Sequence, residues 1–88
     1  MKKALENKMN KLAKQFPMAW FKDGGDFCES KSNTIWTGEG SCVGDDYMFC
    51  HYGYRDTMGV HPKFEAALKK LGLWAEFYDG GTVFIYES

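Results

Sequence analysis

Two segments of the chain carry hydrophobic residues at helical spacing. The first, residues 4–16, ends before Pro17, which cannot continue a helix. The second begins at Pro62, which suits a first helical turn, and ends at Gly72, which suits the position after a last turn. Each segment therefore predicts an amphipathic helix, with an apolar stripe of Leu5, Met9, Leu12 and Phe16 in the first and of Phe64, Leu68 and Leu71 in the second.

Shorter apolar runs between turn-forming residues predict six strands. Asp23-Gly24-Gly25 and Asp79-Gly80-Gly81 each separate two such runs, which predicts a hairpin turn at both places. The glycines of residues 38–41 (GEGS) are expected to end a central strand. The predicted strands are residues 18–22, 26–29, 33–37, 47–52, 73–78 and 82–87.

The segments around the two Asp-Gly-Gly turns are similar beyond the turns themselves. Residues 12–25 and residues 68–81 share leucine, lysine, alanine and phenylalanine at corresponding positions, and each reads helix, strand, turn, strand. This suggests two α-β-β units with a central hairpin inserted between them. The alternative is coincidence, because any two helix-hairpin units share leucine in the helix and Asp-Gly in the turn.

Length and element order predict the fold class. Eighty-eight residues form one domain, residues 1–88, with a single core. The predicted order is α-β-β-β-β-α-β-β, and we expect an α+β fold in which a mostly antiparallel sheet of five to six strands packs on two helices. A domain of this size buries a modest share of its surface, and an aromatic content of 17% supplies large side chains to bury.

Charge is distributed unevenly along a chain whose net charge is −1. Residues 1–22 carry six lysines and one glutamate, whereas residues 23–88 carry five basic and eleven acidic residues. The acidic part argues against direct nucleic-acid binding, and the lysines of the first helix are typical of a solvated face, with phosphate contact as the alternative. These lysines interrupt any signal peptide, and no stretch has the length of a transmembrane helix, so we expect a cytoplasmic protein without membrane contact.

The cysteines form no recognisable metal or catalytic motif. Cys28, Cys42 and Cys50 lack the close pairs of structural zinc sites, and their odd number in a cytoplasmic protein predicts reduced thiols. Cys50 and His51 would point to opposite faces of a strand, which prevents activation of the thiol, and His61 is expected at a helix start. We therefore expect no catalytic residues, no metal and no cofactor, although convergence of the three cysteines with a histidine stays open.

Neither glycine-rich element predicts a phosphate-binding loop. The Asp-Gly-Gly segments join strand to strand rather than strand to helix, and their aspartates would repel a phosphate. Residues 37–41 (TGEGS) indicate a wide turn or bulge between central strands. The alternative is contact with a small ligand, because Gly38 and Gly40 allow close approach of the backbone and two aspartates come soon after them.

Aromatic residues lie on both predicted faces of the sheet. Trp74 and Tyr78 alternate with Ala75 and Phe77 along one strand, and the last strand has the same alternation. Because two helices cover only one face, some aromatic side chains should be exposed or buried against another chain, as is typical of recognition surfaces. The alternative is a tightly packed aromatic core.

Two segments, Trp36-Thr37-Gly38-Glu39-Gly40-Ser41 and residues 59–86 (GVHPKFEAALKKLGLWAEFYDGGTVFIY), resemble short uncharacterised proteins that bacteriophages and prophages encode. The resemblance covers most of the chain, and its motifs are structural rather than catalytic. It implies a small α+β accessory factor of a phage or mobile element, located in the cytoplasm of the host bacterial cell. Many such proteins bind and block a host enzyme or defence complex, as anti-CRISPR proteins do.

The sequence and this resemblance together predict a non-enzymatic binding protein that inhibits a host protein or protein complex. The expected surface lies on the central hairpin that the two similar units do not explain, where acidic and aromatic residues combine. The alternative is a small-ligand or nucleotide-binding protein that uses stacked aromatics and the TGEGS loop, and a homodimer stays open. The expected binding residues are Trp36, Glu39, Asp45, Asp46, Tyr47, Tyr52 and Tyr54.

Overall fold

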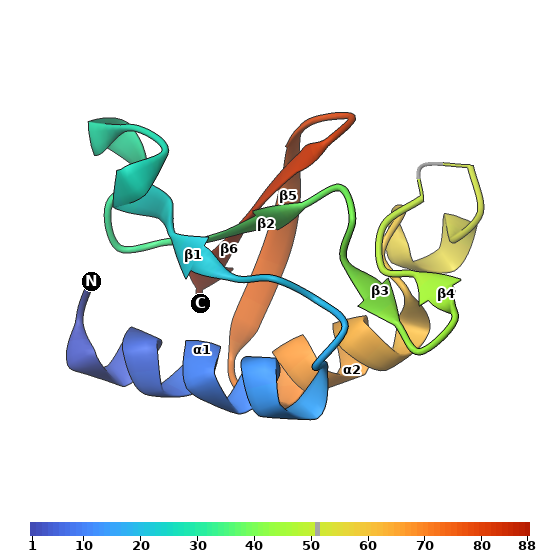
Figure 1. The fold of residues 1–88 in the computed structure, drawn as a ribbon, viewed down its shortest axis with the longest axis horizontal. Coiled ribbons are helices and arrows are strands. Elements are labelled where there is room, and N and C mark those ends of the chain that lie inside the picture. Colours follow the sequence, from blue (N-terminus) through green and yellow to red (C-terminus); the bar gives the residue numbers. More distant parts are fainter. Residues whose placement is uncertain (51) are drawn as a thin grey trace.

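A computed structural model of the chain describes residues 1–50 and 52–88. Two helices, α1 (Lys3–Gln15) and α2 (Pro62–Lys70), lie on one side of a sheet (Figure 1). The strands of the described residues are β1 (Lys22–Asp23), β2 (Ile35–Gly38), β3 (Cys42–Val43), β4 (Asp46–Tyr47), β5 (Leu73–Asp79) and β6 (Thr82–Glu87). The described residues also form three short 3-10 helices: η1 (Gly24–Asp26), η2 (Glu29–Lys31) and η3 (Arg55–Thr57).

The strands form two antiparallel sheets rather than one. The larger sheet has the order β1-β2-β6-β5, and β3 and β4 pair separately. The α+β class and the antiparallel sheet on two helices are confirmed, but the prediction of one sheet with five to six strands is wrong. The chain leaves the larger sheet at Gly38, where a Cβ atom would lie 2.2 Å from the carbonyl oxygen of Gly81. This close approach to the β5–β6 turn ends β2 and sends the chain outward to form the β3–β4 hairpin.

The larger sheet divides into two similar halves. One half consists of α1, β1 and β2, and the other consists of α2, β5 and β6. In each half the first strand lies at an edge and the second lies at the centre, where β2 and β6 pair antiparallel from Ile35–Ile85 to Gly38–Thr82. The predicted α-β-β order is present in both halves, with the β3–β4 hairpin between them.

The two Asp-Gly-Gly segments share a turn but lead into different elements. The Oδ1 atom of Asp23 accepts a hydrogen bond from the amide of Gly25 (2.8 Å), and Oδ1 of Asp79 accepts one from Gly81 (2.9 Å). After Gly81 the chain returns at once as β6, so the second predicted hairpin is confirmed. After Asp23 it instead forms η1 and η2, so the predicted return strand 26–29 is wrong, and eleven residues separate β1 from β2.

The composition of the two segments explains this difference. Residues 83–86 (VFIY) alternate β-branched and aromatic side chains, which favours a strand. Asp26, in contrast, begins a polar run with a single large apolar residue, Phe27. The amide of Gly24 donates to the carbonyl of Thr34 (2.9 Å), which closes the long connection at its base. The first Asp-Gly-Gly segment is therefore the start of a closed loop rather than a hairpin turn.

Two further predicted strands are shorter than expected. The predicted strand 18–22 is confirmed only at Lys22, which begins β1. The predicted strand 47–52 is confirmed only at Tyr47, which ends β4, because Met48 is fully buried and Phe49 instead forms an isolated bridge to Val60. The predictions for His51 lie outside the described residues.

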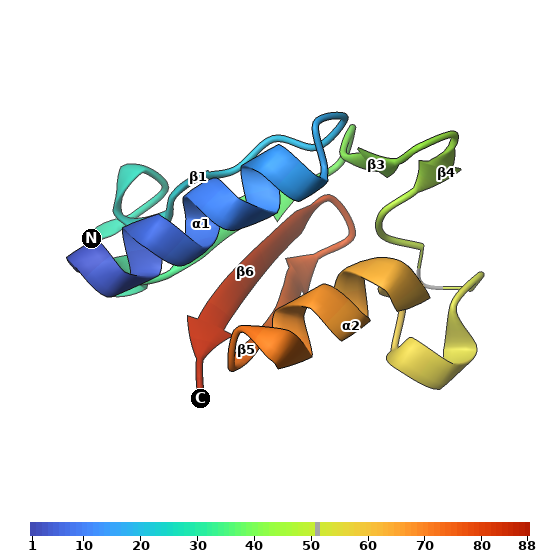
Figure 2. The ribbon, with the colours of Figure 1, turned by 90° about the horizontal axis from the view of Figure 1, so that it is seen from below.

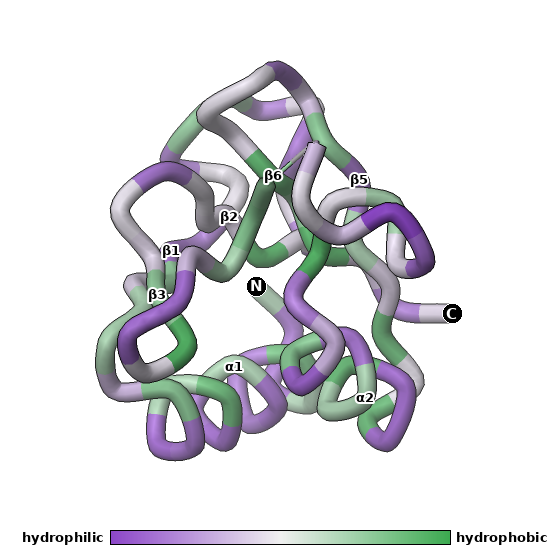
Figure 3. The backbone as a smooth tube through the Cα atoms, turned by 90° about the vertical axis from the view of Figure 1, so that its right-hand side faces the viewer, coloured by the Kyte–Doolittle hydropathy of each residue, from purple (hydrophilic) through white to green (hydrophobic). Residues whose placement is uncertain are grey.

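Phenylalanine dominates the core between the helices and the sheet. Figures 2 and 3 show α1 and α2 on the same face of the sheet. Phe64 of α2 lies at the centre, and its ring contacts Phe16, Phe21 and Phe49 at centroid distances of 5.1, 6.0 and 5.7 Å. The buried aliphatic and sulfur-containing residues around these rings are Leu5, Leu12, Ile35, Met48, Val60, Ala67, Leu68, Leu73 and Ile85.

The opposite face of the sheet, which we call the outer face, carries tryptophan, tyrosine and lysine. The connection between β1 and β2 folds over it and places Phe27 against Trp36, Tyr78 and Phe84, with ring centroids 5.2, 5.3 and 5.1 Å apart. Phe84 is buried as a result, although Tyr78 stays 56% exposed. The prediction of aromatic residues on both faces is confirmed, and the β1–β2 connection covers some of the aromatic residues on the outer face.

Two lysines lie over the aromatic rings of the outer face. Nζ of Lys31 donates a hydrogen bond to the hydroxyl of Tyr86 (2.8 Å) and lies 4.9 Å from the ring centroid of Phe84. This hydrogen bond raises the pKa of the Lys31 ammonium group. Nζ of Lys22 lies 5.2 Å from the ring of Trp36. The cation–π contact of Lys31 holds the β1–β2 connection against the sheet.

Candidate partner-binding surface

The β3–β4 hairpin is attached to the body of the protein at both of its ends. The amide of Cys42 donates to the carbonyl of Met18 (3.1 Å), and the amide of Met48 donates to the carbonyl of Ser41 (3.1 Å). The carbonyl of Met48 in turn accepts the amide of His61 (2.8 Å), and its side chain is fully buried. These contacts fix the direction of the hairpin tip, which carries Asp45.

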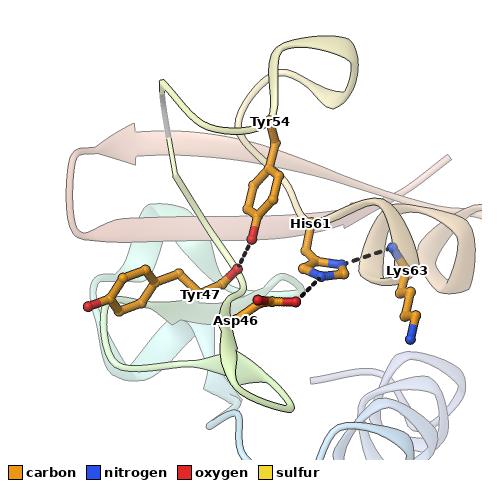
Figure 4. Close-up of polar contacts among 5 residues, drawn as sticks. All are labelled: Asp46, Tyr47, Tyr54, His61 and Lys63. Carbon is orange, nitrogen blue, oxygen red and sulfur yellow. Dashed lines mark hydrogen bonds and ion pairs between the residues drawn. The ribbon is translucent and has the colours of Figure 1, made fainter.

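His61 joins the hairpin to the start of α2 (Figure 4). Its Nδ1 accepts the backbone N–H of Lys63 (3.1 Å) and thereby caps the helix, which confirms the predicted helix-start role. Its Nε2 lies 3.3 Å from Oδ2 of Asp46. Because a backbone N–H can only donate, Nδ1 is the acceptor nitrogen and Nε2 carries the proton toward the carboxylate.

Tyr54 supports the hairpin from the other side. Its hydroxyl donates to the carbonyl oxygen of Tyr47 (2.7 Å), and its ring lies against the imidazole of His61 at 5.2 Å (Figure 4). Burial raises the pKa of the Tyr54 phenol, and the charge of Asp46 raises it further. The phenol therefore stays protonated and keeps its role as a hydrogen-bond donor at neutral pH.

Six of the seven predicted binding residues lie on this hairpin or on the chain segments directly before and after it. Asp46, Tyr47 and Tyr54 take part in the hydrogen bonds that hold the hairpin, and the side chain of Tyr47 is 71% exposed. The exposed residues Asp45 and Tyr52, the latter 91% exposed, lie on the hairpin tip and on the loop before Tyr54. We call the set Glu39, Asp45, Asp46, Tyr47, Tyr52 and Tyr54 the acidic surface.

Glu39 reaches this surface from the TGEGS loop. Its amide donates to the carbonyl of Gly81 (2.9 Å), and its carbonyl accepts Nε1 of Trp20 (2.9 Å). The loop thus packs on the β5–β6 turn, and a pocket of about 500 Å³ opens between them. Its lining residues are Gly38, Glu39, Gly40, Ser41, Tyr47, Phe49, Gly80, Gly81 and Val83.

Trp36 does not belong to the acidic surface. It lies in β2 on the outer face, where its ring contacts Trp20 at 5.5 Å and Phe27 at 5.2 Å. Sequence reasoning placed Trp36 on the central hairpin because it expected residues 33–37 to pair with residues 47–52. The structure instead pairs β2 with β1 and β6, so the grouping of Trp36 with the hairpin residues is corrected.

Sequence reasoning missed the contact between His61 and Asp46. The two residues are fifteen positions apart and belong to a hairpin and a helix cap, so no local spacing indicates that they meet. The composition of the helix start could have indicated such a contact. A histidine directly before Pro62 can cap the helix with one ring nitrogen, which leaves the other nitrogen able to bond to a distant residue.

The described residues offer little for metal chemistry. No group of three or more histidine, cysteine, aspartate or glutamate side chains within residues 1–50 and 52–88 is arranged to hold a metal ion. Cys28, Cys42 and Cys50 are free thiols, and the hydroxyl of Ser30 lies 3.2 Å from the sulfur of Cys28. Both ring nitrogens of His61 are engaged, so this imidazole is not available as a general base without breaking the helix cap.

Comparison with known proteins assigns neither a family nor a function to this surface. Family models, curated proteins and solved structures were each compared with the chain, and none of them matches it. Within the described residues, neither α1 nor α2 has the length and apolar character that crossing a bilayer requires.

Proposed function

We propose that this protein is a non-enzymatic binding protein that recognises a basic patch of a partner protein through the acidic surface. The observation that carries the proposal is the combination of carboxylates and an exposed tyrosine on a hairpin that buried contacts hold in place, with a second exposed tyrosine on the loop that follows it. Tyr47 presents a large exposed ring next to Asp45 and Asp46 in the hairpin, and Tyr52, on the loop that follows the hairpin, presents a second. Tyrosine is enriched at interface hot spots, and complementary charge steers association.

The rigid support of the hairpin favours recognition over a solubilising role alone. A carboxylate that serves only solubility does not need a fixed direction, whereas Asp46 lies against His61, which is nearly buried. A surface held in its binding geometry before association loses less conformational entropy when the partner binds.

The biological setting that we propose comes from the resemblance to phage and prophage proteins. The protein would act in the host cytoplasm as an accessory factor of a phage or mobile element. It would inhibit a host protein or defence complex by occluding a functional basic surface, in the manner of an anti-CRISPR protein. Such a surface is found on proteins that bind nucleic acid, which carry large positive fields.

Affinity purification from a bacterial lysate with mass spectrometry tests this proposal. The folded chain is the bait, and a variant with both Tyr47→Ala and Tyr52→Ala is compared with it. We expect a specific basic partner to be retained by the native chain and lost with the variant, and its affinity to fall as salt is raised. Met18→Ala is the matched control, because Met18 is exposed (62%) and lies outside the acidic surface.

Two results would contradict the proposal. A partner that binds the double variant and the native chain equally well places the interface elsewhere. Recovery of no specific partner, together with a small molecule that copurifies with the bait, favours a second candidate function.

The second candidate is a small-ligand or nucleotide-binding protein, and the pocket under the TGEGS loop favours it. Four glycines line this pocket and leave its wall formed by backbone, while Tyr47 and Phe49 add aromatic rings. The carboxylate of Glu39 at the pocket disfavours a phosphate and favours a neutral or cationic ligand.

A thermal-shift panel separates the two candidates. Nucleosides, nucleotides and cationic amines are added to the pure chain, and a ligand that binds the native state raises the melting temperature. The Gly80→Trp variant adds a bulky ring beside the pocket, at a position where no atom lies within 4 Å of a new Cβ, and should remove any shift that arises there. A panel without any shift counts against the second candidate and leaves the first untouched.

A further inference from the structure

Strand β5 forms a long edge of the larger sheet. The order β1-β2-β6-β5 places it outermost, and β5 has seven residues, whereas β1 at the other edge has two. Within residues 1–50 and 52–88, no other strand pairs with β5 besides β6. An edge strand of this length presents a row of backbone donors and acceptors that can pair with another chain.

A groove runs along this edge. It is lined by side chains from both faces of β5, namely Trp74 and Glu76 from the outer face and Ala75 and Phe77 from the helix side. Residues from both faces can line one groove only where the groove lies at the edge itself. Helix α2, which packs beside β5 (Figure 2), forms a second wall with Glu65 and Lys69.

The loop after η3 forms the third wall of this groove and carries an unusual methionine. Met58 is 86% exposed and adopts a left-handed backbone conformation with φ of 52°. This conformation is unfavourable for a residue with a side chain, and the fold maintains it beside the groove. Trp74, which is 42% exposed, lies on the same groove and adds a second apolar contact. An exposed methionine adapts its shape to different apolar side chains.

The negative charge of the groove indicates which kind of chain can bind there. Three carboxylates line it, those of Asp56, Glu65 and Glu76, against the single ammonium group of Lys69. A second copy of this chain paired through β5 would bring these carboxylates close to their own counterparts, which is unfavourable. An extended segment with basic residues is the complementary occupant.

We infer that the β5 edge is a second binding site, which captures an extended segment of a partner protein as an additional strand. The segment alternates apolar and basic residues: the apolar ones contact Met58 and Trp74, and the basic ones contact the carboxylates of the groove. Its backbone pairs with β5, in the manner of β-strand addition. Because paired strands have the same rise per residue, the seven residues of β5 can pair with about seven residues of the segment. This site is separate from the acidic surface and does not depend on the function proposed for it.

Selection from a display library of random twelve-residue peptides tests this inference on the complete chain. We expect the selected peptides to carry lysine or arginine at alternate positions with apolar residues between them. Titrated into the isotope-labelled protein, a selected peptide should shift the amide resonances of β5 and of Glu65 and Lys69, and should slow hydrogen exchange along β5 by about tenfold or more.

Three modified reagents make the result specific. Met58→Gly removes the side chain and relieves the left-handed strain, so it should weaken the peptide by about fivefold without harming the fold. Glu76→Lys should weaken it by about fivefold as well. A peptide with N-methyl groups at alternate residues should not bind, because it cannot donate to the edge strand.

The variant with Tyr47→Ala and Tyr52→Ala should bind the selected peptide as the native chain does, which separates this site from the acidic surface. Selection of no peptide, resonance shifts confined to the acidic surface, or unchanged binding by Met58→Gly and by the N-methyl peptide would each overturn the inference. Concentration-dependent dimerisation that protects the β5 amides would also overturn it, because the occupant would then be a second copy of the chain.

Discussion

The two Asp-Gly-Gly segments have the same turn and lead to different structures. In each, the aspartate carboxylate accepts the amide two residues later at nearly the same distance, 2.8 Å at Asp23 and 2.9 Å at Asp79. In the second turn the first glycine is open, and no atom lies within 4 Å of a Cβ placed on Gly80. In the first turn the corresponding glycine is closely packed, since a Cβ on Gly24 would lie 2.0 Å from Oγ1 of Thr34.

A turn in which an aspartate side chain accepts the amide two residues later is called an Asx turn. The difference between the two segments shows that such a turn changes the direction of the chain but does not determine which element follows. The sequence after Gly81 supplies a strand, and β6 returns along β5. The sequence after Gly25 supplies a polar loop, which places Phe27 over the outer face. The same local turn therefore makes a hairpin in one half of the sheet and a cover for the sheet in the other.

The strongest test of this comparison replaces the first glycine of each turn with alanine. Gly24→Ala should lower the free energy of unfolding by about 3 kcal/mol, because the new methyl group overlaps Thr34 and the carbonyl of Lys31. Gly80→Ala should instead raise it by up to about 1 kcal/mol, because the site is open and the unfolded chain loses freedom. Urea unfolding of both variants measures the difference, and equal effects would show that the two turns are equally packed.

The cover of the outer face is tested by Phe27→Ala. Removal of a ring that contacts Trp36, Tyr78 and Phe84 should cost about 2 kcal/mol of unfolding free energy. Met18→Ala, at an exposed side chain, should change it by less than about 0.5 kcal/mol. If thermal unfolding shows the two variants to be alike, the β1–β2 connection does not stabilise the sheet.

The shared turn chemistry is tested by Asp23→Ala and Asp79→Ala. Each removes one carboxylate–amide hydrogen bond, and each should cost about 1 kcal/mol. A carboxylate oxygen of Asp23 also lies 3.5 Å from the N-terminal ammonium group. In dilute buffer, Asp23→Ala should therefore lower the free energy of unfolding slightly more than Asp79→Ala does. In about 1 M salt, where exposed charges are screened, denaturant unfolding should give equal values for the two variants. A larger cost for Asp79→Ala would contradict the shared role of the turns.

The smallest expected effect concerns the hairpin inserted between the two halves. Tyr54→Phe removes the hydrogen bond to the carbonyl of Tyr47 and should lower the free energy of unfolding by about 0.5 kcal/mol or slightly more. The pKa of this phenol is raised above its ordinary value of 10.0. Below that value both folded and unfolded chains are protonated; as the pH rises above it, the unfolded chain loses its proton first and the native protein loses stability.

Alkaline titration with detection of the phenolate by ultraviolet absorbance measures this prediction. The difference between the native chain and Tyr54→Phe should contain a phenol that ionises above the ordinary value. A difference curve centred below that value would mean that Tyr54 is not protected by burial or by Asp46.

The elements predicted well from sequence are those whose signals are local. Helix α2 begins at Pro62 and ends shortly before Gly72, whose φ of 69° needs a residue without a side chain. Strand β6 has the predicted limits, because its alternation is regular and its turn is short. Helix α1 is displaced by one residue from the predicted range, within the usual fraying of helix ends.

The elements predicted poorly depend on contacts between distant parts of the chain. The return strand 26–29 fails because Gly24 packs on Thr34 rather than leading into a hairpin. The strand 47–52 fails because the backbone of Met48 bonds to Ser41 and His61, which draws the chain away from a regular strand. In the acidic surface, the sequence indicated the residue types, but the Asp46–His61 contact and the separation of Trp36 arise from tertiary packing.

The division of aromatic residues between the two faces gives the protein a built-in optical reporter. Trp20, Trp36 and Trp74 all contact residues of the outer face, Trp74 by stacking on Tyr86 at 4.5 Å. On the helix side, the ring contacts of Phe64 with other described residues involve phenylalanine. Tryptophan fluorescence will therefore respond to quenchers and binding events on one side of the sheet. The helix side will contribute almost no emission, so a ligand's position can be assigned to a face without a label.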